Sequence, residues 1–155
     1  MGLMLLFILE ISLGQTKINQ INIQEKDNIE KAIHAIIGWV ANKDTALLFN
    51  HILQDSNFLE VHPNKKIVKG YNEFHKSIIF FMDTAFKPVR YEIRDLQINI
   101  AESATVAWFY CVLDDINEWK GKPANWENTR WTGVLEKRDG QWRMVQQHFS
   151  FAKTQ

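Results

Sequence analysis

The sequence contains little cysteine and no excess of charge of either sign. Cys111 is the only cysteine among 155 residues, so the chain cannot form an intramolecular disulfide, and one thiol cannot build a zinc site. Cys111 lies in the apolar run "ATVAWFYCVL", where we expect a buried, inert thiol. Lys plus Arg and Asp plus Glu number 18 each, which leaves no basic excess for binding a phosphate backbone. We therefore expect no nucleic-acid partner.

Motifs for metal and cofactor chemistry are also missing. The histidines form no HExxH motif and no other paired metal-ligand spacing, and no carboxylate cluster accompanies them; they are His34, His51, His62, His75 and His148. The sequence has no glycine-rich phosphate loop, no G-x-S-x-G elbow and no long internal repeat. These absences predict a protein that uses neither a metal nor another cofactor.

Aromatic residues, by contrast, are abundant. The chain holds six Trp and ten Phe, and its 46% apolar and 23% charged residues are typical of a globular protein. A chain of this length most simply forms one domain. So many large rings in it predict a thick aromatic core or an aromatic-lined cavity.

The first fourteen residues, "MGLMLLFILEISLG", differ from the rest in being apolar. The small residues Ser12 and Gly14 precede Gln15 as at the cleavage site of a signal peptide, although no basic residue precedes the run and Glu10 interrupts it. The run is too short to span a bilayer, so we expect no stable membrane anchor. If residues 1–14 are a signal peptide, the protein is exported to the periplasm or secreted; otherwise it is cytoplasmic and these residues form an ordinary helix.

The first half of the remaining chain predicts helices. One helix begins at a capping box formed by Asp27 and Glu30, a second is capped by Asp44, and a third covers residues 71–85. The positions expected to face inward in the first two helices are Ile29, Ile33, Ile36, Ile37, Val40, Leu47, Leu48 and Ile52. A short strand then ends at His62-Pro63.

The second half predicts long strands, over residues 89–100, 105–116, 126–137 and 141–152. Asp139-Gly140 is a strong signal for a tight hairpin, and residues 118–128 predict a longer, mobile hairpin loop. Helices followed by a meandering antiparallel sheet predict an α+β fold with helices on one sheet face. Such a sheet curls, and the cone that it forms can leave an unfilled end, which would be a pocket.

Several stretches resemble one family. "NKDTALLF", "KGYNEF" and "TRWTGVLEKRDGQWRMVQQHFSF" are similar to a SnoaL-like domain of the nuclear transport factor 2-like superfamily, with residues 25–152 as the domain after a flexible segment over 15–24. The features that carry the similarity are Arg130, Thr132, the Asp139-Gly140 turn, Trp142, His148 and Ser150. The resemblance implies a cone-shaped, cystatin-like roll of three helices on a curved, mainly antiparallel sheet, and a homodimer formed through the sheet. It implies no single activity, since members range from isomerases, cyclases and dehydratases to association domains.

His62 is the first candidate catalytic residue. In isomerase-like relatives, the position before the proline at the end of the first strand holds the base, and a histidine can serve as a base near neutral pH. The alternative is a half-exposed histidine without a role. The resemblance places a tyrosine acid of those relatives at Ile36, which cannot donate a hydrogen bond. This departure argues against a ketosteroid isomerase mechanism, and the sequence offers no convincing acid.

His148 and Ser150 are two residues apart and therefore share one strand face. The alternation of apolar residues does not decide which face is inside, but the resemblance favours His148 as a catalytic residue and Ser150 as a substrate-binding residue in the cavity. A core histidine with satisfied hydrogen bonds is the alternative. The neighbouring strand carries Arg130 and Thr132, and its pairing depends on the turn: a three-residue loop with a bulge pairs Arg130 with His148, whereas a two-residue loop pairs Trp131 with it.

The remaining candidates are substrate-binding residues. A buried Arg130 would suit a carboxylate-bearing ligand, although it can equally be a surface residue paired with Glu127 or Glu118. Trp108 and Tyr110 share a face of the central strand, which in this fold can also form the pocket wall. We thus expect an aromatic pocket for a small apolar organic ligand, with activity as a cofactor-independent isomerase, cyclase or hydratase left open. A non-catalytic homo-oligomerisation or sensory module is the alternative.

Overall fold

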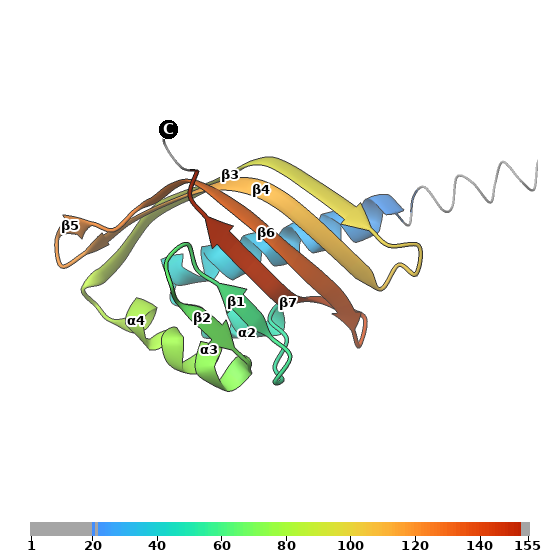
Figure 1. The fold of residues 1–155 in the computed structure, drawn as a ribbon, viewed down its shortest axis with the longest axis horizontal. Helices are drawn as coiled ribbons and strands as arrows, with labels where there is room; N and C mark the ends of the chain where they lie inside the picture. The colour runs from blue at the N-terminus through green and yellow to red at the C-terminus, as the bar shows by residue number, and fades with distance from the viewer. Residues whose placement is uncertain (1–19, 21, 153–155) are drawn as a thin grey trace, which may run out of the picture.

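The computed structural model describes residues 20 and 22–152 (Figure 1). A long helix over residues 22–38 continues directly into a short 3-10 helix. The elements that follow are η1 (Trp39–Ala41), α2 (Thr45–Asn50), β1 (Leu59–Val61), β2 (Ile67–Lys69), α3 (Tyr71–Ser77), α4 (Ile79–Met82), β3 (Phe86–Ile100), β4 (Val106–Trp119), β5 (Lys122–Pro123), β6 (Trp126–Arg138) and β7 (Gln141–Ser150). The signal peptide predicted over residues 1–14 lies outside the described residues.

The strands form one curved sheet in the order β2-β1-β7-β6-β4-β3, with β5 paired to β4. Strands β1 and β7 run parallel, and the other pairs are antiparallel. In Figure 1 the long strands arch over the long helix, and α3 and α4 lie below them, with α4 under the end of the sheet that carries β5. This is the predicted α+β arrangement, in which helices cover the concave face of a mainly antiparallel sheet.

The long helix buries the predicted apolar stripe. Ile29, Ile33, Ile36 and Val40 are buried and Ile37 is partly buried. The next helix is also as predicted at its start, because the Asp44 carboxylate accepts a hydrogen bond from the Leu47 backbone N–H at 2.9 Å. Leu48 and Ile52 point into the core, but Leu47 is 37% exposed, so its predicted inward orientation is wrong.

The start of the long helix lies earlier than predicted. The helix expected to begin at Asp27 is already formed at residues 22–24, which were assigned to a flexible segment. Glu25 gives the physical reason, because its carboxylate accepts hydrogen bonds from Lys137 Nζ at 2.8 Å and Trp142 Nε1 at 2.7 Å. These bonds tie the first turns of the helix to the β6–β7 hairpin. A tertiary contact of this kind leaves no local signal in the sequence.

The predicted third helix divides into α3 and α4 and ends at Asp83, whose backbone is extended. Lys43 holds this end in place by donating from its Nζ to the carbonyl oxygens of Phe81 at 3.1 Å and Asp83 at 2.6 Å. The loop predicted over residues 118–128 is also interrupted. Strand β4 continues to Trp119, and β5 and the start of β6 lie within the predicted loop.

The β6–β7 hairpin contains both a predicted and an unpredicted feature. Asp139 and Gly140 form the predicted hairpin turn. It is a two-residue turn, one of the two loop lengths that the sequence left open, with φ values of 52° and 78° that match type I′. Further along, Leu135 pairs with Met144 and Val134 with Gln146, so that Val145 is an extra residue in β7. This bulge turns every later side chain of β7 to the face opposite to the one that uninterrupted alternation predicts.

The core fills the space between the long helix and the concave face of the sheet. Its largest fully buried side chains include Trp131, Phe58, Leu113 and Met144. Among the described residues, none of the helices is long and apolar enough to cross a membrane.

Candidate small-molecule site

A cavity of about 450 Å³ lies between the helices and the concave face of the sheet. The long helix, η1, α3, α4 and the strands β1, β4, β6 and β7 all contribute to its wall. Its aromatic lining residues are Trp39, Phe74, Phe80, Phe81, Phe86, Trp126 and Phe149, and its polar ones include Glu60, His62, Asn64, Lys66, Asp115, Asn117 and Gln147. The cavity is thus an apolar chamber whose polar groups lie on strands β1, β4 and β7 and in the loop between β1 and β2, as is usual for a site that binds a small organic molecule.

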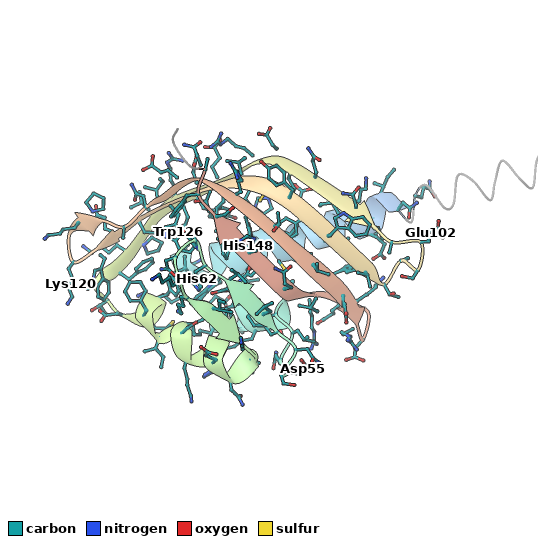
Figure 2. All side chains as sticks on the ribbon, in the orientation of Figure 1. Asp55, His62, Glu102, Lys120, Trp126 and His148 are labelled. Carbon is teal, nitrogen blue, oxygen red and sulfur yellow. The ribbon has the colours of Figure 1, made fainter. Side chains whose placement is uncertain are left out.

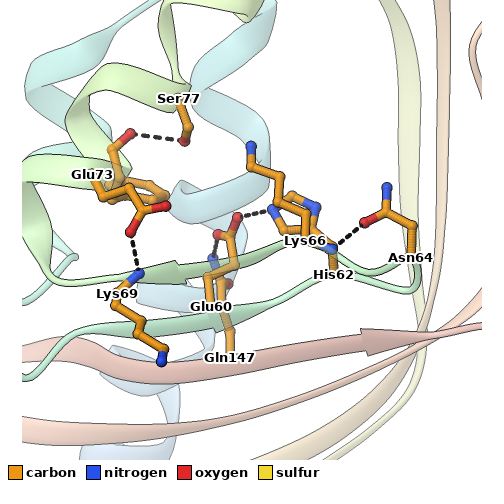
Figure 3. A network of polar contacts seen from close by, with 9 residues as sticks. Glu60, His62, Asn64, Lys66, Lys69, Glu73, Ser77 and Gln147 are labelled. Atoms are coloured by element: carbon orange, nitrogen blue, oxygen red, sulfur yellow. Dashed lines mark hydrogen bonds and ion pairs between the residues drawn. The ribbon is translucent and has the colours of Figure 1, made fainter.

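Glu60 and His62 form the first polar group in this cavity (Figure 3). Because β1 runs parallel to β7, Glu60 lies beside Gln147, and the Gln147 side-chain N–H donates to the Glu60 carboxylate. The other carboxylate oxygen contacts Nε2 of His62 in an ion-pair arrangement. Glu60 is only 6% exposed. A buried carboxylate in this position holds the imidazole and compensates the positive charge that the ring gains when it accepts a proton.

Aromatic rings enclose His62 on its other sides. Its ring centroid lies 5.8 Å from that of Trp126, edge to face, and 6.4 Å from that of Phe149. Figure 2 shows His62 and Trp126 close together beneath the sheet. The predicted catalytic candidate therefore lines the cavity, oriented by Glu60 and in contact with the aromatic wall. The alternative, a half-exposed histidine, does not agree with the structure, since the His62 side chain is only 13% exposed.

Asp115 is a second titratable group in the same cavity, and the sequence analysis did not identify it. It lies on β4 directly opposite Trp126 of β6, so His62 and Asp115 both neighbour the same indole. Burial raises the pKa of the Asp115 carboxyl above its usual value, and a hydrogen bond with the Asn117 side chain offsets part of this rise. A carboxyl with a raised pKa keeps its proton to higher pH and is suited to donate it.

Regular alternation along β4 places Asp115, rather than Asp114, on the cavity side, since Leu113, Asp115 and Asn117 all line the cavity. Leu113 pairs with Thr129 and Asp115 with Trp126, so β6 has one extra residue at this point, and Asn128 there has a φ of 50°. The two adjacent aspartates differ in the face of β4 that they occupy. The sequence analysis expected the opposite face of this strand, with Trp108 and Tyr110, to form the pocket wall, which explains why Asp115 was not assigned as an acid.

Ile36 lines the cavity from the long helix, at the position for which the resemblance implies a tyrosine acid in isomerase-like relatives. The side chain is 4% exposed and cannot donate a hydrogen bond. In this chain the candidate acid therefore comes from the sheet instead of the helix.

The other predicted site residues lie on the opposite, outer face of the sheet. Trp108, Tyr110, Arg130, Thr132, His148 and Ser150 do not line the cavity, so the expectation that they do is wrong. The sheet does bring them together, because Thr132 pairs with both Tyr110 and His148, and Arg130 pairs with Ser150. His148 is exposed and Trp108 is 48% exposed.

For His148 and Ser150, the bulge at Val145 is the physical cause of this difference, whereas the residues on β4 and β6 face outward by the alternation of their own strands. The two-residue turn alone would pair Trp131 with His148, but the extra residue shifts the register so that Thr132 takes this place. Neither predicted alternative therefore describes the hairpin. As a result, Gln147 and Phe149 line the cavity, whereas His148 faces away from it.

Two further expectations concern metal binding and Cys111. Within the part of the chain that the structure describes, no group of three or more His, Cys, Asp or Glu side chains is placed to hold a metal ion. Cys111 is fully buried, and burial raises the pKa of its thiol to about 12. The expected inert thiol is confirmed, since it stays protonated at neutral pH.

The chain matches the family described as SnoaL-like domain over residues 29–154. Comparison with curated proteins finds no match. A candidate scytalone dehydratase from Novosphingobium aromaticivorans has a TM-score of 0.73 at 16% identity, covering 88% of this chain and 90% of that one. A candidate dehydratase of the NTF2-like family from Streptomyces avermitilis has a TM-score of 0.69 at 15% identity, with coverages of 83% and 96%. A candidate calcium/calmodulin-dependent kinase II association domain from Exiguobacterium sibiricum has a TM-score of 0.67 at 7% identity, with coverages of 83% and 93%.

At these identities the structural similarity establishes the fold and not the activity. The predicted cystatin-like roll is confirmed, since solved structures described as NTF2-like share its architecture. The family match extends from the long helix through the last strand. The chain therefore belongs to the SnoaL-like domain family.

Proposed function

We propose that the cavity binds a small, largely apolar organic molecule and that His62 and Asp115 transfer protons on it without a cofactor. The observation that carries this proposal is the meeting of a carboxylate-oriented histidine and a carboxyl of raised pKa at one aromatic cavity. An acid and a base whose environments differ in this way are typical of proton-transfer sites. The dehydratase names carried by two structural neighbours are consistent with such chemistry.

The chemistry can be written for a cyclic ligand that bears a hydroxyl group β to a carbonyl. His62 removes the proton from the carbon next to the carbonyl, and the electron pair of that C–H bond forms a carbon–carbon double bond. The C–O bond of the hydroxyl breaks, and Asp115 supplies the proton with which the oxygen leaves as water. The reverse sequence is hydration, and return of the proton at another carbon is isomerisation. The apolar wall supports these steps by limiting access of bulk water.

Exchange of ligand protons with solvent tests the proposal without knowledge of the natural substrate. Hydroxylated bicyclic ketones, such as 6-hydroxy-1-tetralone, are incubated with the protein in D₂O, and loss of the α-proton signal is followed by NMR. We expect the wild-type chain to accelerate the exchange and His62→Gln to abolish this acceleration. Asp115→Asn should keep this exchange, because no hydroxyl group leaves from this ketone, and should slow the loss of water from a ketone with a β-hydroxyl group by roughly 100-fold, the usual scale of one general acid.

His148→Gln is the matched control, because it changes a histidine on the outer face of the same sheet. It should exchange at the wild-type rate. Equal rates for the wild type and His62→Gln would overturn the assignment of the base, and so would a loss of activity in His148→Gln alone.

One observation supports the alternative, a module that assembles copies of the chain. On the outer face, Trp108 is 48% exposed and lies on β4 between Val106 and Tyr110, which are partly exposed. An exposed tryptophan among apolar neighbours is typical of a protein interface, and one structural neighbour is named as an association domain. We propose a homodimer through this face, which is compatible with a catalytic cavity on the other. Light scattering should show a dimer for the wild type and a monomer for Trp108→Lys; a monomeric wild type would contradict it.

A further inference from the structure

Two buried amide oxygens in the cavity have no hydrogen-bond partner among the described residues. They are Oδ1 of Asn117 and Oε1 of Gln147, and the two side chains belong to residues that are 4% and 2% exposed. Both residues line the cavity, from β4 and β7 respectively. Buried polar atoms in folded proteins are almost always satisfied, so two unpaired acceptors in one cavity call for a specific explanation.

The orientation of each amide is fixed by its nitrogen. The Gln147 side-chain nitrogen donates to the buried Glu60 carboxylate, and the Asn117 side chain is hydrogen-bonded to the Asp115 carboxyl. With both nitrogens engaged by carboxyl groups, the oxygens are the free ends of the amides. An amide oxygen can only accept hydrogen bonds. These two atoms therefore need donors, which a bound molecule can supply.

The charged side chains around the cavity further limit the class of ligand that it can bind. Lys66 is the only Lys or Arg side chain among the described lining residues, and it is exposed. The polar region contains the Glu60 carboxylate and the acceptor oxygens, which would repel a ligand carboxylate. The predicted carboxylate-binding role of Arg130 does not apply to this cavity, because Arg130 is on the outer face.

We propose that the ligand is a neutral hydroxylated ring compound that presents at least two hydrogen-bond donors to Asn117 and Gln147. The hydroxyl groups meet the acceptor oxygens, and the ring lies against aromatic residues such as Phe149 and Trp126. This inference deepens the proposed function by naming the ligand class of the same cavity. Molecules of the same shape that only accept hydrogen bonds leave the two oxygens unpaired and bind more weakly.

Calorimetric titration with three probes of one ring system tests this selectivity. The probes are 1,3-dihydroxynaphthalene, which donates, 1,3-dimethoxynaphthalene, which only accepts, and naphthalene, which does neither. We expect the diol to bind the wild-type chain roughly 10-fold or more tightly than the diether, the effect of two net hydrogen bonds. Asn117→Leu and Gln147→Met should each reduce this preference, and His148→Gln on the outer face should leave it unchanged.

The outcomes separate the ligand class from the proposed chemistry. Equal or tighter binding of the diether or of naphthalene overturns the inference while leaving a cavity that binds apolar rings and can still exchange protons. Absence of binding by all three probes overturns the inference together with the binding role of the cavity. A preference for the diol in a chain that shows no proton exchange would support the inference and remove the catalytic proposal. The wild-type series decides the question even if neither cavity variant folds.

Discussion

The two faces of the sheet are built from the same strands but have different chemistry. The concave face carries Asp115, Asn117 and Gln147 among aromatic residues. On the outer face, the same strands carry Arg130, His148 and other residues that resemble family features. Successive side chains of a strand point to opposite faces, so a shift of one residue moves each side chain from one face to the other. The comparison teaches that one bulge in β7, as much as residue identity, assigns Gln147 to the site and His148 to the outer face.

Two tryptophans allow the largest test of this comparison. Trp131 is fully buried on the concave face, where it packs against Phe109 and Phe149, whereas Trp108 is 48% exposed on the outer face. Trp131→Ala should lower the free energy of unfolding by about 3–5 kcal/mol because it empties a core site. Trp108→Ala should change it by about 0.5 kcal/mol or less in the monomer. Chemical denaturation measures both.

Measuring the stability of Trp108→Ala at several protein concentrations makes this test more specific. If the outer face forms the proposed homodimer, Trp108→Ala should lower stability more at high protein concentration than at low concentration. The effect of Trp131→Ala should not show this difference. Equal destabilisation by the two variants in the monomer would contradict the assignment of the faces.

Much of the fold could be predicted because its signals are local. Asp44 caps its helix through its own side chain, and Asp139-Gly140 adopts the turn that this dipeptide favours. The apolar stripe from Ile29 to Val40 needed only the helical period. His62 was a candidate because the resemblance implies a base before the proline that follows the first strand, and the structure places this residue at the cavity.

The rest of the site could not be predicted, because its determinants are not local. The bulge at Val145 turns His148 outward and Gln147 inward, and "MVQQ" contains neither glycine nor another residue that marks such a position. Asp115 follows the alternation of β4, but the burial that raises its pKa exists only in the complete cavity. Alternation with a period of two residues predicts one face for each side chain, but it does not reveal the residue at which a bulge reverses this assignment.

Asp114 and Asp115 allow the two faces of the sheet to be compared at adjacent residues, because Asp115 lines the cavity and Asp114 does not. Asp114 Oδ1 accepts a hydrogen bond from the Asn128 backbone N–H at 2.6 Å, and Oδ2 accepts one from Arg94 Nη2 at 2.8 Å. The Asn128 N–H, with help from Arg94, holds the pKa of the Asp114 carboxyl below its usual value. Asp114→Asn should therefore lower the free energy of unfolding at neutral pH by about 0.5–1.5 kcal/mol.

The pH dependence of the Asp114 variant follows from the direction of this shift. A carboxyl whose pKa is lower in the folded state stabilises the fold above its unfolded pKa, near 3.8, and this contribution is lost as the pH falls through the folded value. The difference between the wild type and Asp114→Asn should hence shrink below about pH 4. Denaturation at several pH values measures it, and a difference that grows on acidification would contradict the role of the bulge contacts.

The pH dependence of stability that Asp115 contributes should have the opposite sign. Burial raises the pKa of this carboxyl, so the folded state binds its proton more tightly than the unfolded state does. Its ionisation therefore costs stability as the pH rises above the unfolded value. Asp115→Asn, which removes that charge, should raise the free energy of unfolding at pH 7 by about 0.5 kcal/mol and have a smaller effect at pH 3. The same variant should slow the loss of water from a β-hydroxy ketone, which distinguishes an acid that is retained for chemistry from one retained for the fold; a variant destabilised at pH 7 with unchanged loss of water would make Asp115 a structural residue.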